Sequence, residues 1–206
     1  TALLLNTKFL GRGLARALII IPWAVPEVVA CLVWILMYDK DYGIINFLLN
    51  NAGILSHNIA YLQDVSVALP AAMVVNIWKG FPYVAIMLLA GMQSVSTDLY
   101  EAADIDGCGM FRKFFSLTLP YIKPTIIMTV LLRTIWIFNS FDLIVIITGG
   151  GPVNYSQTLP SYMYSKAFAS YDFGLASAFG VLLIVILGIY AVLFLKLSNY
   201  DKAGDF

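Results

Sequence analysis

The sequence predicts an all-α, polytopic helical membrane protein, and three observations support this. Of its 206 residues, 61% are hydrophobic and only 12% are charged, a far more apolar composition than that of a soluble domain. The apolar residues collect in segments of about 20 residues, the length that a helix needs to cross roughly 30 Å of hydrocarbon. The segments lack the alternating polarity over about ten residues that is typical of outer-membrane barrels.

Four membrane spans are predicted, separated by polar segments that carry Gly, Pro and Asn. In chain order they are about Ala17 to Tyr38, Val67 to Met92, Pro124 to Ile147 and Phe173 to Leu197. Pro22 and Pro26 interrupt helix hydrogen bonds in the first span and predict a kink there. Because Thr1 is not a methionine and the next residues are apolar, we expect a fragment in which residues 1–206 form one transmembrane domain without its first helix or helices.

The basic residues predict the orientation of the spans, because cytoplasmic loops are enriched in Lys and Arg. Lys40 and Lys166 fall on one side of the predicted membrane. Eight others fall on the opposite side: Lys8, Arg12, Arg16, Arg112, Lys113, Lys123, Lys196 and Lys202. The loop between the second and third spans is therefore expected in the cytoplasm.

That loop, residues 94–120, is predicted to be a structured helix-turn-helix. Its sequence Glu101-Ala102-Ala103-Asp104-Ile105-Asp106-Gly107 is followed after nine residues by Leu117-Thr118-Leu119-Pro120. Asp98 is placed to cap a helix whose third residue is Glu101, and Gly107 is placed to end it in a left-handed conformation. Phe111, Phe114 and Phe115 are expected to pack the second helix against the membrane domain.

The spacing of this loop resembles the EAA loop of ABC importer permeases, which in that family docks into a groove on a cytoplasmic ATPase. The resemblance implies the type I ABC importer transmembrane-domain fold with a cytoplasmic coupling loop. It assigns the ATPase-coupling role to Glu101, Ala102, Ala103, Asp106, Gly107, Leu119 and Pro120. The alternative is an amphipathic surface hairpin with well-formed caps.

Two further regions resemble the sugar permeases of the maltose and glycerol-phosphate importer class. The first is Thr148-Gly149-Gly150-Gly151-Pro152 with the residues after it, namely Leu159, Tyr162, Tyr164, Ala167, Phe168, Gly174, Ala176 and Ala178. The glycines predict a bend, and the small residues predict close helix packing. The second region comprises Pro22, Pro26, Trp34, Gly43 and Asn46.

Polar residues inside the spans are candidates for a translocation path, because ionisable groups in a bilayer usually face a partner, a cavity or a substrate. The candidates are Asn76, Lys79, Tyr83, Arg133, Asn139 and Asp142. Asn76 and Lys79 are spaced to share a helix face, as are Asn139 and Asp142. Aromatic rings for sugar stacking are expected among Trp78, Tyr83, Trp136 and Phe138. The alternative is that Glu27, Lys79 and Arg133 form ion pairs that fix helix packing.

No phosphate-binding loop, nucleophile triad or metal cluster is found in the sequence. The run Gly149 to Gly151 is not followed by Lys-Ser or Lys-Thr, so the chain is not expected to be an enzyme or to bind a cofactor. The resemblance places ATP and Mg²⁺ on a partner ATPase. The net charge is zero, which does not suggest nucleic-acid binding.

The resemblance implies a permease subunit of an ATP-driven, binding-protein-dependent carbohydrate importer that works by alternating access. It also implies the cytoplasmic (inner) membrane of a bacterial or archaeal cell as the location. The partners that it implies are a cytoplasmic ATPase dimer, a second permease subunit, an extracytoplasmic sugar-binding protein and membrane lipid. The alternatives are an ABC importer permease for another small solute and an ion-gradient-driven secondary transporter.

Overall fold

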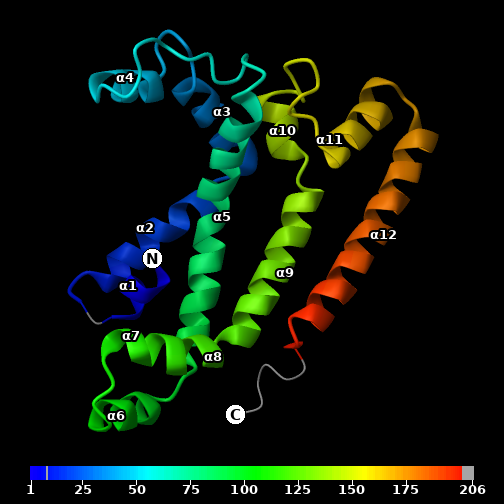
Figure 1. The fold of residues 1–206 in the computed structure, drawn as a ribbon. Helices are drawn as coiled ribbons and strands as arrows, with labels where there is room; N and C mark the ends of the chain where they lie inside the picture. The colour runs from blue at the N-terminus through cyan, green and yellow to red at the C-terminus, as the bar shows by residue number, and fades with distance from the viewer. Residues whose placement is uncertain (8, 201–206) are drawn as a thin grey trace. The chain divides into compact units, whose positions relative to one another are not determined.

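All regular secondary structure in the described part of the chain is helical (Figure 1). The structure is a computed structural model that describes residues 1–7 and 9–200. The α-helices are α1 Ala2–Asn6, α2 Arg12–Ala24, α3 Glu27–Met37, α4 Ile44–Asn51, α5 Ala68–Gln93, α6 Thr97–Ile105, α7 Met110–Lys113, α8 Leu119–Tyr121, α9 Lys123–Asn139, α10 Asp142–Ile147, α11 Leu159–Tyr164 and α12 Phe173–Leu197. Two π-helical turns, η1 Phe114–Thr118 and η2 Ser165–Ala169, continue α7 and α11.

The second and fourth predicted spans are confirmed as single helices. Helices α5 and α12 have 26 and 25 residues, and each is long and apolar enough to cross a membrane. The first predicted span is divided between α2 and α3, which pass the same test only when they are taken together. Pro26 lies at the break with φ −55° and ψ 140°, whereas Pro22 stays inside α2. The predicted kink is therefore confirmed at Pro26, where the proline cannot supply the N–H that would continue the helix.

The third predicted span is wrong as one continuous helix. Helix α9 ends at Asn139, and α10 begins at Asp142. The N–H of Ser140 bonds to the carbonyl of Ile137, a tight last turn that ends α9. Polar side chains compete with helix hydrogen bonds, and an acidic residue in a first turn favours a new helix start. These local effects at 139–142 outweigh the apolar composition of the segment.

The contacts within the chain form two compact units. One contains residues 1–21, 81–136 and the end of the chain from Leu187. The other contains residues 22–80 and 137–186. The first unit has a core of five buried side chains, Leu5, Leu89, Met92, Val95 and Ile122. The single transmembrane domain over 1–206 stays a prediction.

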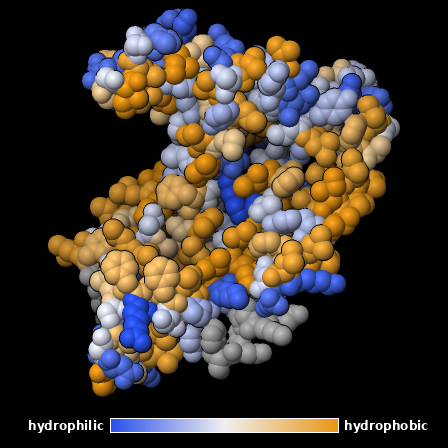
Figure 2. All heavy atoms as spheres, viewed as in Figure 1, coloured by the Kyte–Doolittle hydropathy of each residue, from blue (hydrophilic) through white to orange (hydrophobic). Residues whose placement is uncertain are grey.

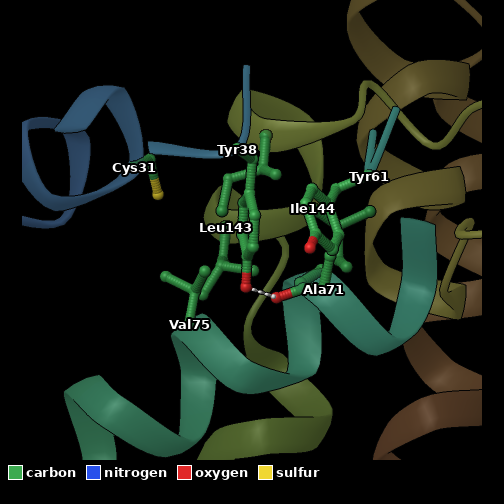
Figure 3. Packing of buried hydrophobic residues seen from close by; sticks show 9 residues of the cluster. Cys31, Tyr38, Tyr61, Ala71, Val75, Leu143 and Ile144 are labelled. Carbon is green, nitrogen blue, oxygen red and sulfur yellow. Dashed lines mark hydrogen bonds between the residues drawn. The ribbon is translucent and has the colours of Figure 1, made fainter. Parts of the chain in front are cut away.

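The core of the second unit joins α3, α5 and α10 (Figure 3). Tyr38, at the end of α3, donates a hydrogen bond from its hydroxyl to the carbonyl of Ala71 in α5 over 3.1 Å. Leu143 and Ile144 of α10 pack in the same cluster, with Val75 of α5 beside them. The tyrosine thus buries its ring while its hydroxyl keeps a polar partner.

Helix α12 presents apolar side chains over much of its length (Figure 2). Val181 is 62% exposed, Ile184 is 72% exposed and Leu197 is 81% exposed. A helix with this surface requires an apolar surrounding, which lipid or a neighbouring helix supplies.

The segment between α3 and α5 is organised around the side chain of Asn46, which is only 2% exposed. Its amide nitrogen donates to the carbonyls of Asp39, Lys40 and Ile59, and its amide oxygen accepts from the N–H of Ile59 at 3.0 Å. One buried amide therefore serves backbone groups from both sides of α4, as a buried polar group must.

A substitution at Gly43, the residue before α4, tests how tightly this segment is packed. A Cβ atom at this position would lie 2.2 Å from the carbonyl oxygen of Asp39 and 2.6 Å from that of Met37. We expect Gly43→Ala to lower the stability by about 1–3 kcal/mol, because backbone atoms would have to move. Thermal unfolding of the purified protein measures the loss. Gly188→Ala, where no atom lies within 4 Å of the new Cβ, is the control, and equal effects of both changes would contradict the prediction.

Candidate coupling loop and translocation path

Helix α6 of the predicted coupling loop ends at a glycine in the left-handed conformation, as expected. Gly107 has φ +70°. Its N–H bonds to the carbonyl of Asp104 at 3.1 Å, and the N–H of Cys108 bonds to the carbonyl of Ala103 at 2.9 Å. These two bonds form a Schellman motif, which satisfies the last carbonyls of the helix and turns the chain sharply.

The predicted start of α6 is wrong. The helix begins at Thr97 with Ser96 as its N-cap, and no side chain makes a capping hydrogen bond there. Glu101 is therefore the fifth residue of the helix and not the third. Asp98 lies in the first turn, where a negative charge stabilises the helix without accepting a capping bond.

Of the predicted coupling residues, four present an exposed surface: Glu101, Ala102, Asp106 and Gly107. Ala103, Leu119 and Pro120 are half-buried. Leu119 and Pro120 lie in the short helix α8, close to the end of the loop.

Two side-chain contacts that the sequence analysis missed join α6 to the helix after it. Lys113 of α7 forms an ion pair with Asp104 of α6. The hydroxyl of Tyr100 in α6 lies 2.9 Å from that of Thr118, which is only 5% exposed. Neither pair could be found from the sequence, because the partners lie 9 and 18 residues apart across a turn. These two contacts therefore tie α6 to the helical segment that follows it.

The phenylalanines of the loop do not pack as expected. Phe111 is 81% exposed and Phe115 is 61% exposed, whereas Phe114 is half-buried. Together with Leu3, Met92 and the neighbouring loop residues they line a pocket of about 490 Å³. Tyr100 and Thr118, which are joined through their hydroxyls, line the same pocket.

Lys79 of α5 lies at the break in the first span. Its Nζ donates to the carbonyl of Val25 over 2.7 Å and lies 3.6 Å from Oε2 of Glu27, the first residue of α3. The side chain of Lys79 is 14% exposed and that of Glu27 is 34% exposed. The ion pair that the alternative interpretation expects is therefore present for Lys79 and Glu27. The carbonyl of Val25 lies just after the end of α2, where no helix N–H is available to bond to it. Lys79 supplies the missing donor.

The two asparagine candidates line different pockets. Asn76 borders a pocket of about 190 Å³ whose other lining residues are mostly apolar. Asn139 borders a pocket of about 390 Å³ that is rich in aromatic side chains. There the rings of Phe141 and Tyr164 stack with centroids 5.0 Å apart, and Phe168 lies 5.0 Å from Tyr164.

Asn139 and Asp142 do not share one helix face, contrary to the prediction. Asn139 ends α9 and Asp142 begins α10, because the chain leaves the helical conformation between them. Asp142 is exposed in the first turn of α10.

The remaining candidates are two path residues, Tyr83 and Arg133, and the aromatic residues expected to stack on sugars. Tyr83 of α5 lies against Trp136 of α9, with ring centroids 4.7 Å apart, and Arg133 is half-buried in α9. Trp78 packs edge-on against Trp34 at 5.6 Å. Trp136 and Phe138 remain 45% and 48% exposed.

The glycine-rich segment forms the predicted bend. Gly149 and Gly150 have φ values of +62° and +84°. The hydroxyl of Ser156, which is fully buried, lies 2.7 Å from that of Thr148 and donates to the carbonyl of Gly151 at 2.6 Å. The bend is therefore held from inside by two hydroxyl groups.

Two carboxylates on the segment between α3 and α5, those of Asp39 and Asp64, have lowered pKa values. Backbone N–H groups of Tyr42 and Asp41 donate to Asp39 and lower its pKa, because they stabilise the charged form. The hydroxyl and N–H of Ser66 lower the pKa of Asp64 in the same way. Both carboxylates hold turns that flank α4.

Residues 1–199 match the family described as the binding-protein-dependent transport system inner membrane component. The chain belongs to this family. As an inner membrane component of a transport system it resides in that membrane, and it is not an enzyme.

A curated relative of this transport component is the trehalose/maltose transport system permease protein MalF of Thermococcus litoralis. The two are 38% identical over 201 residues, which cover 98% of this chain and 67% of the relative. The chain thus spans about two thirds of the length of this relative.

Two solved structures have the same fold. One is a bacterial ABC transporter involved in the import of the acidic polysaccharide alginate, with a TM-score of 0.86, 23% identity and coverage of 96% of this chain and 70% of the other. The second is a bacterial alginate ABC transporter in complex with an alginate pentasaccharide-bound periplasmic protein, with a TM-score of 0.82, 23% identity and coverage of 98% and 69%. The predicted all-α type I ABC importer fold is confirmed.

The contact between Lys79, Glu27 and the break in the first span makes a testable prediction. We expect Lys79→Met to destabilise the transport component by about 1–3 kcal/mol, because it leaves the carbonyl of Val25 and the carboxylate of Glu27 without their donor. The double variant Lys79→Met/Glu27→Gln should recover part of the loss, since no uncompensated charge remains. Thermal unfolding of all variants measures the coupling. Strictly additive effects of Lys79→Met and Glu27→Gln would show that the pair does not interact.

Proposed function

We propose that this inner membrane component is a permease subunit of an ATP-driven carbohydrate importer that works by alternating access. The relative and the solved structures above support the substrate class, because their names specify trehalose or maltose and alginate, which are all carbohydrates. The observation that carries the mechanism is the coupling loop, whose exposed end from Glu101 to Gly107 is held rigidly to the following helix.

The loop is suited to receive a mechanical input on the cytoplasmic side. Its exposed surface contains two small residues, Ala102 and Gly107, and two acidic residues, Glu101 and Asp106. Small residues let another backbone approach closely, and the carboxylates offer hydrogen-bond acceptors. We propose that this surface docks on a cytoplasmic ATPase dimer, which binds ATP and Mg²⁺ on its own subunits.

The ion pair of Asp104 with Lys113 and the contact of Tyr100 with Thr118 would make α6 move together with the helical segment after it. This segment continues through α8 into α9, so the motion would reach a membrane helix. The helices Met110–Tyr121 and α9 meet at a bend of 64°, at Ile122. We propose that this bend acts as a hinge, because hinge motions occur at a few residues between rigid elements. ATP binding and an external binding protein would each bias one of two access states.

The aromatic pocket beside Asn139 is the best candidate for sugar contacts in the second unit. Sugars bind through rings that stack on their apolar faces and through amides that pair with their hydroxyls. Asn139 lies with Phe141 and Tyr164 in this pocket, so both kinds of group are present. We include Asn76, Lys79, Tyr83, Arg133 and Asp142 as further path residues, with Lys79 acting through its hold on the broken span.

The remaining partners follow from the same proposal. A second permease subunit would complete the path and cover apolar helix surface such as that of α12, with lipid around the pair. An extracytoplasmic sugar-binding protein would deliver the substrate. A permease for another solute and an ion-gradient-driven secondary transporter are the competing functions, and transport that persists without any ATPase would favour the latter.

The docking role is tested at Gly107 in the full-length protein, co-expressed with its ATPase and companion permease. We expect Gly107→Pro to abolish co-purification of the ATPase, because proline cannot adopt φ +70° and lacks the N–H that bonds to Asp104. Gly107→Asn is the matched control, since asparagine tolerates the left-handed conformation and keeps the N–H.

The outcome is read from the ATPase retained per membrane subunit. Retention by Gly107→Asn and loss by Gly107→Pro, with both variants inserted in the membrane, supports docking through this turn. Equal retention by both would contradict it.

The path is tested at Asn139. We expect Asn139→Ala to reduce sugar uptake about tenfold, as the loss of one hydrogen bond worth about 1.4 kcal/mol would do, while assembly with the partners is unchanged. Asn76→Ala should reduce uptake less, because its pocket is smaller and is lined by no aromatic ring on which a sugar could stack. Uptake of labelled sugar into vesicles that contain the complex measures both. Loss of the assembled complex on Asn139→Ala would show a structural role instead.

A further inference from the structure

Two arginine side chains converge at the start of α2. Arg12 is the first residue of the helix and Arg16 the fifth, so the two project from one face. The amide oxygen of Gln93, the last residue of α5, accepts from Nη2 of Arg12 at 2.8 Å and from Nη2 of Arg16 at 2.7 Å when its amide faces them. The two Nη2 atoms therefore lie within about 5.5 Å of each other, because both contact the same oxygen.

The side chain of Arg12 is also held from its other edge. Its Nε donates to the carbonyl of Leu5 in the last turn of α1 over 2.7 Å. The guanidinium is thus positioned by two helices before any ligand arrives. A pre-positioned donor loses little conformational entropy on binding.

The charges of this pair are not balanced within the described residues. No carboxylate of residues 1–7 and 9–200 lies within 4.0 Å of either guanidinium. Nε of Arg16 is buried and has no hydrogen-bond partner there. Like charges four residues apart repel, and a positive charge at a helix N-terminus opposes the helix dipole. All four features favour an anion beside the pair.

The geometry of the hydrogen-bond donors indicates which kind of anion fits the site. Guanidinium groups present planar forks of N–H donors that match the oxygens of a phosphate. The charge distribution of the loops places the start of α2 and the end of α5 on the cytoplasmic side of the membrane, at the level of the headgroups. Basic pockets between membrane helices on this side are suited to anionic lipid headgroups.

We propose that Arg12, Arg16 and Gln93 form a binding site for one phosphate group at the cytoplasmic surface of the membrane, with an anionic phospholipid headgroup or free phosphate as its source. Binding neutralises the arginine pair and joins the end of α1 and the start of α2 to the end of α5.

The position of the site connects it to the coupling loop. Leu5 of α1 and Ala15 and Ile19 of α2 pack in the same hydrophobic cluster as Leu99 and Tyr100 of α6. A phosphate that fixes α1 and α2 therefore also stiffens the support of the loop. The inference rests on the proposed function only for its effect on transport, and not for the binding itself.

Binding is tested on the full-length protein in its assembled complex, purified in detergent. Its melting temperature is measured with added phosphatidylglycerol, with phosphatidylcholine of the same chain length, and with inorganic phosphate at constant ionic strength. We expect stabilisation by phosphatidylglycerol beyond that by phosphatidylcholine, with at least tenfold weaker apparent affinity in Arg12→Gln/Arg16→Gln. The charge-matched variant Arg12→Lys/Arg16→Lys should also bind more weakly, because lysine lacks the planar fork.

Lys196→Gln is the control, because it removes a cation from the last turn of α12 without touching the pair. It should keep the full phosphatidylglycerol response. Saturation by inorganic phosphate alone identifies free phosphate as the source, and a response to phosphatidylglycerol alone identifies the lipid. If the double variant does not assemble, Arg16→Gln alone is compared by counting bound phosphatidylglycerol in native mass spectrometry.

Two results would overturn the proposal. One is an equal phosphatidylglycerol response of the wild type and the glutamine variants. The other is a structure of the full-length complex in which a carboxylate from another segment or subunit lies within 4.0 Å of both guanidiniums. Transport assays separate this proposal from the proposed function, since binding can fail while ATP-driven sugar uptake remains.

Discussion

The hydrogen bond from Lys79 to the carbonyl of Val25 solves a problem that every broken membrane helix faces. No water is available in hydrocarbon, so a backbone group freed by a break must find a partner within the protein. Pro26 ends α2 and cannot continue its hydrogen bonds, and Lys79 supplies the donor over 2.7 Å while Glu27 balances its charge. The break can therefore persist at a fixed place, and the core of Tyr38, Val75 and Leu143 is built next to it.

Buried polar side chains also hold the irregular segments elsewhere in the chain, where burial within the protein rather than lipid excludes water. Asn46 serves backbone groups on both sides of α4, and Ser156 and Thr148 hold the glycine bend from inside. In the coupling loop Thr118 meets Tyr100 at 2.9 Å. Each is a single polar side chain, buried or nearly so, placed where the backbone leaves regular structure. This arrangement explains how a chain with so few charged residues maintains defined loops.

The distribution of charge adds a second level of organisation. Lys79 and Lys113 each have an acidic partner, whereas Arg12 and Arg16 meet at the amide of Gln93 and have no carboxylate within 4.0 Å among residues 1–7 and 9–200. If the loop couples to an ATPase, as we propose, the ion pair within the loop would keep it as one body while it moves. The proposed phosphate site would let the membrane surface influence how firmly that body is held.

The sequence by itself determined the features that depend on local backbone preference. It predicted the helical class, the long spans α5 and α12, the kink at Pro26, and the helix end at Gly107, because apolar length, proline and glycine act within a few residues. It misplaced the start of α6 and missed the break at Ser140, where weak local signals compete. Only the tertiary structure decided that Lys79 meets Val25, 54 residues away, and that Gln93 meets two arginines. Such contacts depend on how the helices pack. The sequence contains several polar side chains long enough to make them, and it does not distinguish among these.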